Sequence, residues 1–272
     1  MSKITLNRSP LSIFLVLLFT ILISGLPGGQ TGTAAEALDS LNSTERGVFS
    51  RGELVYVSNG KDLGSEKYEL IKDDSGEIVL VSEGVVTPPI PIPFVKPKIK
   101  FDQEIRVGAD FSPLSLELNY DGPLGIGSDR LKSTVEDGRI NADLGEERKE
   151  GKVEPVDSYF QGTGGSLAFT ALILSKREPK EIVEIRTGGT GPRGGDDERL
   201  KAYYELRDRE TEEMEIDGSS KVVDRFVLTD PETGVKKVIL ADGGTFIAYL
   251  RLDEENSFYT YRVDLLGENY EF

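Results

Sequence analysis

The sequence predicts a mainly β protein, built either as a strongly curved antiparallel sheet (a half-barrel) or as a sandwich, with one buried apolar helix as plug or lid. About a dozen short strand-like runs follow one another, separated by turn signals such as Asn59-Gly60 and Asp137-Gly138. This spacing is typical of antiparallel sandwiches and barrels. The segment Ser166–Lys176 breaks the pattern, because apolar residues surround it on all sides, as in a buried helix.

The strands before this helix are expected to form a meander. Asn59-Gly60 and Asp73-Asp74-Ser75-Gly76 supply its first two turns. In the second strand Glu66, Tyr68 and Leu70 alternate with their neighbours and therefore share one face. The expected strands of this half are Gly52–Ser58, Ser65–Ile71, Glu77–Glu83, Ile99–Val107, Leu114–Tyr120, Arg130–Glu136 and Arg139–Leu144.

A proline-rich segment, Thr87–Lys98, interrupts the meander. Its five prolines cannot donate ladder hydrogen bonds, so the segment is expected to be extended and to lie at a sheet edge. It is unusually apolar for a loop, and two interpretations stay open: it folds back on the core, or it forms a docking lip for a membrane or a protein partner. Its apolar residues are Ile90, Ile92, Phe94 and Val95.

Around and after the helix the signals are local. Ser166 is of the type that caps a helix N-terminus, and Pro179 follows the end of the helix as a stop signal. The charged segment Gly145–Gly151 and the glycine-rich segment Gly188–Asp197 are expected to be loops. The expected strands of this half are Lys180–Thr187, Tyr203–Arg207, Glu212–Ile216, Lys221–Thr229, Val235–Ala241, Thr245–Asp253 and Ser257–Leu266.

The N-terminus predicts export. Lys3 and Arg8 precede an almost wholly apolar run, Leu11–Leu26, and small residues follow it up to Ala35. These are the parts of a secretory signal peptide. We therefore expect a signal peptide over residues 1–35, a polar lead-in over 36–49 and a single β domain over 50–272, with an uncleaved membrane anchor as the alternative. The expected location is the periplasm, the cell envelope or the outside of the cell.

The composition excludes several kinds of chemistry. The chain has no Cys, His or Trp and a formal net charge of −16. It therefore cannot form disulfides, and it lacks thiolate nucleophiles, histidine bases and imidazole metal ligands. Its acidity argues against nucleic acid as a partner. The acidic turns at Asp73-Asp74 and Asp196-Asp197 lack the spacing of a calcium loop, and the run Gly162–Gly165 lacks the lysine of a phosphate loop. We expect neither metal nor cofactor.

The candidate binding site is apolar. Aromatic residues occur on several expected strands, and tyrosine, which places an apolar body beside a polar tip, is the commoner type there. Together with the apolar helix they predict a cavity that accepts an apolar ligand, unless the helix simply completes the core. The residues expected to line the cavity are Tyr56, Tyr68, Leu167, Phe169, Leu172, Ile173, Phe226, Phe246, Tyr259 and Tyr261.

Four segments carry a resemblance to a known family. These are the opening GELVYVSNGKDLGSEKYEL, the segment Asp110–Glu117 with a proline before a strand, the helix region Gly164–Lys176, and Val235–Leu252 with its turn Asp242-Gly243-Gly244. Together they resemble exported half-barrel proteins related to the lipoprotein carriers LolA and LolB. The resemblance implies a strongly curved antiparallel sheet, a helical lid and a cavity for an acyl chain.

Three functional hypotheses follow. The first is an exported, non-catalytic envelope protein that binds a lipid or acyl chain between the curved sheet and the helical lid. The second is a structural or interaction β-sandwich of the cell envelope, with a protein partner and no small ligand. The third is a secreted hydrolase that uses carboxylates, for which the 48 acidic residues offer pairs.

Overall fold

A computed structural model of the 272-residue chain describes residues 47–87, 98–122, 129–143, 148–153, 157–177, 179–186, 200–252, 257–268 and 270. The predicted signal peptide, most of the lead-in and the loop over 188–197 lie outside the described residues. So does the proline-rich stretch 88–97, with the proposed docking residues Ile90, Ile92, Phe94 and Val95. Within the described ranges, no helix is long and apolar enough to cross a membrane.

The described strands form one sheet of 15 strands, in the order β8-β7-β6-β5-β4-β3-β2-β1-β15-β14-β13-β12-β11-β10-β9. The first eight are β1 (Gly47–Ser58), β2 (Lys61–Lys72), β3 (Ile78–Val86), β4 (Ile99–Val107), β5 (Pro113–Asp121), β6 (Asp129–Glu136), β7 (Arg139–Asp143) and β8 (Arg148–Lys152). The others are β9 (Asp157–Gln161), β10 (Glu181–Arg186), β11 (Lys201–Ile216), β12 (Ser219–Thr229), β13 (Lys236–Asp242), β14 (Thr245–Leu252) and β15 (Ser257–Arg262). The prediction of a mainly β fold is confirmed.

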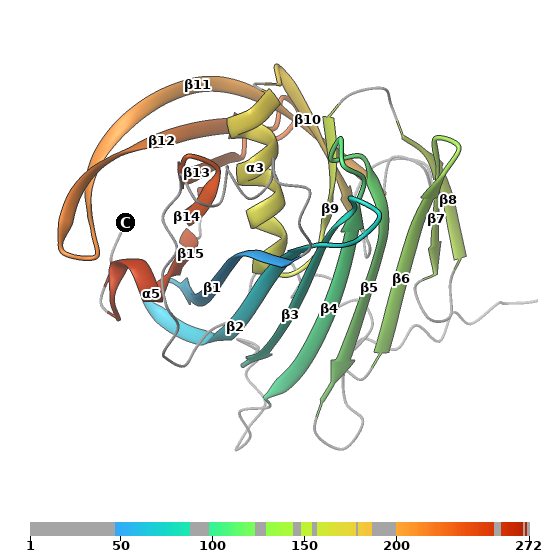
Figure 1. The fold of residues 1–272 in the computed structure, drawn as a ribbon, viewed down its shortest axis with the longest axis horizontal. Helices are drawn as coiled ribbons and strands as arrows, with labels where there is room; N and C mark the ends of the chain where they lie inside the picture. Colours follow the sequence, from blue (N-terminus) through green and yellow to red (C-terminus); the bar gives the residue numbers. More distant parts are fainter. Residues whose placement is uncertain are drawn as a thin grey trace, which may run out of the picture.

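The first and last strands meet in the middle of the sheet. β1 pairs antiparallel with β15, with Tyr56 opposite Thr260. The meander β1–β8 extends from this pair in one direction, and the series β15–β9 extends in the other. Figure 1 shows that the sheet curves around helix α3 (Leu167–Arg177). The fold is therefore a large open half-barrel with a single buried helix on its inner side, as predicted.

One strand pair departs from the predicted antiparallel arrangement. β9 and β10 are parallel, with Tyr159 opposite Glu184, and helix α3 connects them. Parallel neighbours need a crossover connection, because a tight turn cannot return the chain to the edge where the first strand began. Helix α3 is therefore the crossover of a βαβ unit, and the strands at both of its ends fix its position.

The predicted helix matches α3 to within one residue at each end, but the predicted role of Ser166 as N-cap is wrong. A short 3₁₀ turn, η2 (Gly164–Ser166), precedes the α-helix, which begins at Leu167. The Ser166 hydroxyl belongs to this turn and donates a hydrogen bond to the Thr163 carbonyl at 2.7 Å.

Several strands also differ from the prediction, and β9 (Asp157–Gln161) was not predicted. β11 continues through the exposed charged residues at which the sequence predicted a break, because it pairs with β12 over most of its length. β8 occupies most of the segment Gly145–Gly151, which was expected to be a loop, and pairs with β7. The last strand ends at Arg262 and a short helix, α5 (Val263–Leu266), follows it.

The sheet has a hydrophobic core on each side. The inner core lies around α3 and contains the buried residues of β1–β5 and of β9–β15 that face the helix. The outer core lies on the opposite face of β13, β14, β15 and β1. The tip of the long β11–β12 hairpin curls over this face and meets α5, where the Asp217 N–H donates to the Leu265 carbonyl at 3.1 Å. The residues of the outer core include Val57, Ile216, Val223, Leu240, Ala248 and Tyr261.

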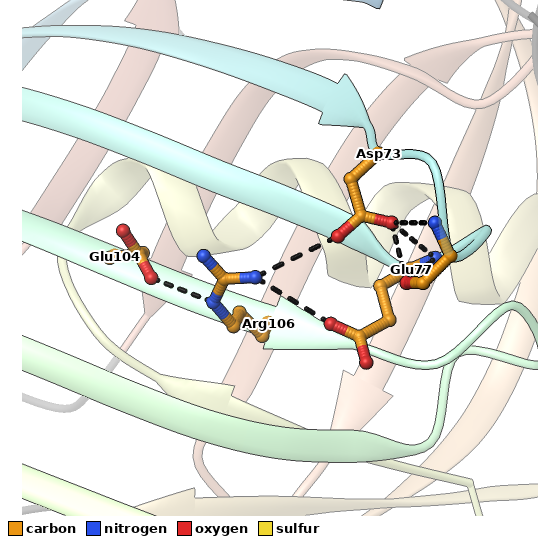
Figure 2. A network of polar contacts seen from close by, with 5 residues as sticks. Asp73, Glu77, Glu104 and Arg106 are labelled. Atoms are coloured by element: carbon orange, nitrogen blue, oxygen red, sulfur yellow. Dashed lines mark hydrogen bonds and ion pairs between the residues drawn. The ribbon is translucent and has the colours of Figure 1, made fainter. Parts of the chain in front are cut away.

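The acidic turn between β2 and β3 is held by its own side chain (Figure 2). Asp73 accepts hydrogen bonds from the Ser75 N–H at 2.8 Å, the Ser75 hydroxyl at 2.6 Å and the Glu77 N–H at 3.1 Å. The hydrogen bond from Ser75 is the main reason why the pKa of Asp73 is lowered. Arg106 lies beside this turn, 3.8 Å from Asp73 and 3.6 Å from Glu77, and also pairs with Glu104 at 2.8 Å. Among the described residues no group of three acidic side chains could hold a metal ion.

Candidate functional site

Helix α3 is enclosed on all sides. Residues Ala168–Leu174 are at most 2 % exposed, and the helix contacts β9, β13 and β14. Its only charged residues, Lys176 and Arg177, lie in the last turn. A helix that is apolar all round is stable in this position because every side of it meets apolar groups. The prediction of a buried apolar helix is confirmed.

Eight of the ten predicted site residues belong to the inner core, but two do not. Tyr259 and Tyr261 lie in the outer core, with their ring centroids 6.2 Å apart. Side chains alternate along a strand, and on β15 it is Phe258 that belongs to the inner core, so its neighbour Tyr259 must face outward. Placing these two tyrosines with the helix was wrong. The eight predicted residues found in or against the inner core are Tyr56, Tyr68, Leu167, Phe169, Leu172, Ile173, Phe226 and Phe246.

Several aromatic residues of the inner core were missed, among them Phe258 and Tyr249. The Phe258 ring lies 6.0 Å from Tyr56 and 6.1 Å from Tyr249, measured between ring centroids. Phe258 and Tyr249 both belong to the core around α3. The alternation along β15 could have identified Phe258, but only if it had been known which face of this strand points inward.

A buried carboxyl lies at the N-terminal end of the helix. Glu66, on β2, is 1 % exposed. Its Oε2 accepts hydrogen bonds from the Tyr56 hydroxyl at 2.5 Å and from the Gly165 N–H at 3.0 Å. Its Oε1 accepts from the Thr163 hydroxyl at 2.5 Å and from the Gln103 amide at 3.3 Å. The carboxyl therefore joins β1, β2 and β4 to the segment that begins the helix. The predicted shared face of Glu66, Tyr68 and Leu70 is confirmed, because all three are buried in the structure.

The groups that bond to Glu66 are all neutral. Burial raises its pKa, against the opposing effect of hydrogen bonds from Ser82, Thr163, Tyr56 and Gly165. Burial, and secondly the nearby charge of Glu66, raise the pKa of Tyr56 well above its usual value. The Tyr56 hydroxyl therefore keeps its proton and acts as a donor to the carboxyl.

The glycine run before the helix is needed for close contact with this cluster. A Cβ atom on Gly164 would lie 1.7 Å from the Tyr56 hydroxyl oxygen, and a Cβ atom on Gly162 would lie 2.0 Å from Oε1 of Gln103. Both neighbours are held by buried hydrogen bonds, to Glu66 and to the Thr163 N–H respectively. Only glycine allows the backbone to approach them.

A second buried cluster lies on β9, β10, β11 and β13. Glu184 forms an ion pair with Lys237, and both are less than 5 % exposed. Glu184 also accepts a hydrogen bond from the Tyr159 hydroxyl at 2.7 Å and pairs with Arg186 at 3.2 Å. The Lys237 ammonium lies 3.9 Å from the centroid of the Tyr204 ring, within cation–π distance.

The opposite charges in this second cluster stabilise each other's ionised form. Burial by itself would raise the pKa of Glu184, but the cations Lys237 and Arg186 outweigh it and lower the pKa to about 2. Burial would likewise lower the pKa of Lys237, but Glu184 raises it well above its usual value. Both groups are therefore charged at neutral pH. No sequence signal predicted the pair, because 53 residues separate its members.

Polar contacts also fix the C-terminal end of the helix. Arg177 pairs with Asp157, at the start of β9, at 2.8 Å and donates to the Asp110 carbonyl at 3.0 Å. Between the two ends the helix contributes mainly apolar side chains. Its buried hydroxyls on Thr170 and Ser175 have no hydrogen-bond partner among the described residues. The helix is thus held by polar bonds at its ends and by apolar packing between them.

Neither buried carboxyl is hydrogen-bonded to a second carboxyl within the described residues. Glu66 lies on β2 and Glu184 on β10, each in its own cluster. Glycoside hydrolysis uses two carboxyl groups that face one scissile bond. No observation among these contacts favours the third hypothesis, a carboxylate hydrolase.

The chain is similar to a solved structure but to no family model or curated protein. No family model matches the chain, and no curated protein matches it. Among solved structures, the chain is similar to the crystal structure of a β-barrel-like protein of domain of unknown function DUF1849 from Brucella abortus. The sequences are 7 % identical, the match covers 79 % of this chain and 95 % of that one, and the TM-score is 0.49.

Proposed function

We propose that this protein is an exported, non-catalytic binding protein that holds an apolar ligand, a lipid or an acyl chain, between its curved sheet and helix α3. One observation carries the proposal: the inner side of the half-barrel encloses a helix that is apolar on all sides. The interior already packs against apolar side chains on every side of the helix. Its lining is therefore also suited to a hydrocarbon chain. Export is inferred from the basic and apolar N-terminal segment.

The contacts of the helix support its role as a movable plug. Ala168–Leu174 meet the sheet through apolar packing, which is non-directional, so an acyl chain could replace these contacts without stranding polar groups. The unpartnered hydroxyl of Thr170 would in that event become available to water or to the ligand. The polar bonds lie at the two ends of the helix, at Gly165 and Arg177.

The second hypothesis, a structural or interaction module without a ligand, is favoured by a different feature of the same helix. The helix residues are already as buried as those of an ordinary core. If the plug never moves, the helix only completes the core, and the function lies in surface contacts with a partner. The two hypotheses differ in whether the inner side takes up an apolar molecule.

Native mass spectrometry after mild extraction distinguishes them. If the protein binds lipid, a fraction of the full chain should carry an extra mass that organic extraction removes and that added palmitate restores. Bare protein under gentle conditions, together with no uptake of palmitate, would leave the structural module as the better account. The same preparation tests export, since the mature mass should lack residues 1–35.

A further inference from the structure

The carboxyl of Glu66 is placed where it can control the start of helix α3. It accepts hydrogen bonds from two donors of the segment before the helix, the Thr163 hydroxyl and the Gly165 N–H. It is also bonded to Tyr56 on β1 and Gln103 on β4, both of which are fixed in the sheet. Loss of this carboxyl's bonds would remove the link from β2 to the segment and leave it held mainly by Gln103, which accepts from the Thr163 N–H at 2.9 Å.

We propose that Glu66 is a proton-operated latch: it fastens the N-terminal end of α3 to the sheet, and its protonation state sets how firmly that end is held. This inference goes beyond the proposed function, because it concerns how the helix is held and requires no ligand.

The groups around Glu66 leave its charge uncompensated. The titratable groups that face it are Tyr56 on β1 and Tyr68 on β2, whose Cβ packs against the same turn. The cation beyond Tyr68, Arg262 on β15, donates to the Tyr68 hydroxyl at 3.1 Å and pairs with Asp264. Helix α3 contributes no titratable group before Lys176. The ionised carboxylate is therefore buried with hydrogen-bond donors but without a counter-ion.

The composition makes Glu66 the natural proton sensor of the chain. No histidine is present, so no side chain has its ordinary pKa between about pH 5 and 8. Of the described carboxyls with a shifted pKa, those of Asp73, Asp110, Glu184 and Asp230 are lowered. Glu66 alone among these is raised, chiefly by burial.

The direction of the switch follows from the two states of the helix end. When that end is released, water reaches Glu66, and its pKa returns to the ordinary value of a glutamate. When the end is docked, burial raises the pKa. The docked state thus binds the proton more tightly, so acid favours docking. Between the two pKa values, each unit rise in pH shifts the equilibrium toward release by up to about tenfold.

Amide hydrogen exchange on the full chain tests the latch. The protection of residues 165–174, corrected for intrinsic exchange rates, should fall in the wild type as the pH rises from about 5 to 8. In Glu66→Gln, which keeps the shape but cannot ionise, protection should no longer depend on pH. Glu69→Gln is the matched control, because Glu69 lies on the same strand with its half-buried side chain on the other face. This control should behave like the wild type.

Three results would overturn the latch: unchanged pH dependence in Glu66→Gln, no pH dependence in the wild type, or an equal change in the strands β2–β4. If Glu66→Gln fails to fold, the pKa of the Glu66 carboxyl can be measured in the wild type by carbon NMR. A pKa above the usual range of glutamate supports the latch, and a pKa within or below that range contradicts it.

Discussion

Replacing Phe169 with alanine is expected to lower the free energy of unfolding by about 3–5 kcal/mol, the usual loss when a packed aromatic ring is removed. The ring lies in the middle of the inner core and is 2 % exposed. The helix packs against β9, β13 and β14, and these elements can fill the space left by the ring only in part. Urea titration of the wild type and Phe169→Ala measures the difference.

Leu167→Ala is the matched control for this prediction. Leu167 lies in the same helix but is only half-buried at the edge of the inner core. Its truncation should cost no more than about 1–2 kcal/mol. If Phe169→Ala costs as little as that, the ring is not packed, and open space already exists beside the helix.

Replacing Lys237 with methionine should also cost about 3–5 kcal/mol, because it leaves the buried charge of Glu184 without its main partner. Adding Glu184→Gln to this variant should recover most of the loss, since no uncompensated charge then remains. The exposed network of Figure 2 offers the contrast: Arg106→Met should cost less than about 1 kcal/mol. A small loss for Lys237→Met would show that Arg186 alone balances Glu184.

The buried pair of Glu184 and Lys237 should make the protein less stable in acid. The pKa of Glu184 falls from an ordinary 4.5 to about 2 on folding. The unfolded chain therefore binds more protons in this interval, so the contribution of Glu184 is complete above about pH 4.5 and disappears as the pH falls toward 2. Urea titrations across this window should show a decline in stability that is weaker in the double variant. An equal decline in both would assign the effect to other carboxyls.

Local patterns in the sequence were sufficient for the fold class and for the helix. Hairpin turn signals and alternation located most strands, and the all-round apolar character of Ser166–Lys176 correctly indicated burial. The alternation of Glu66 with Tyr68 also placed a carboxyl on the buried face. The error at Tyr259 and Tyr261 arose because alternation shows which residues share a face but not which face is inside.

The sequence pattern could not predict which distant strands pair with each other. The parallel pairing of β9 with β10 depends on the crossover, and the meeting of β1 with β15 joins the two ends of the described domain. The polar clusters likewise join distant strands: Glu66 meets Gly165 across 99 residues. No local periodicity carries such information, so the clusters that hold the helix could be found only in the folded chain.

The accessibility of helix α3 in the presence of an acyl chain tests the central claim most directly. The chain has no cysteine, so a single introduced thiol can be followed without interference. Ala171 in the helix and Ala248 in the outer core are both 0 % exposed, which makes Ala171→Cys the probe and Ala248→Cys its control. If the helix is a plug that an apolar ligand displaces, palmitate should speed thiol labelling of Ala171→Cys and leave Ala248→Cys unchanged. Equally slow labelling of both variants, with or without palmitate, would contradict the account.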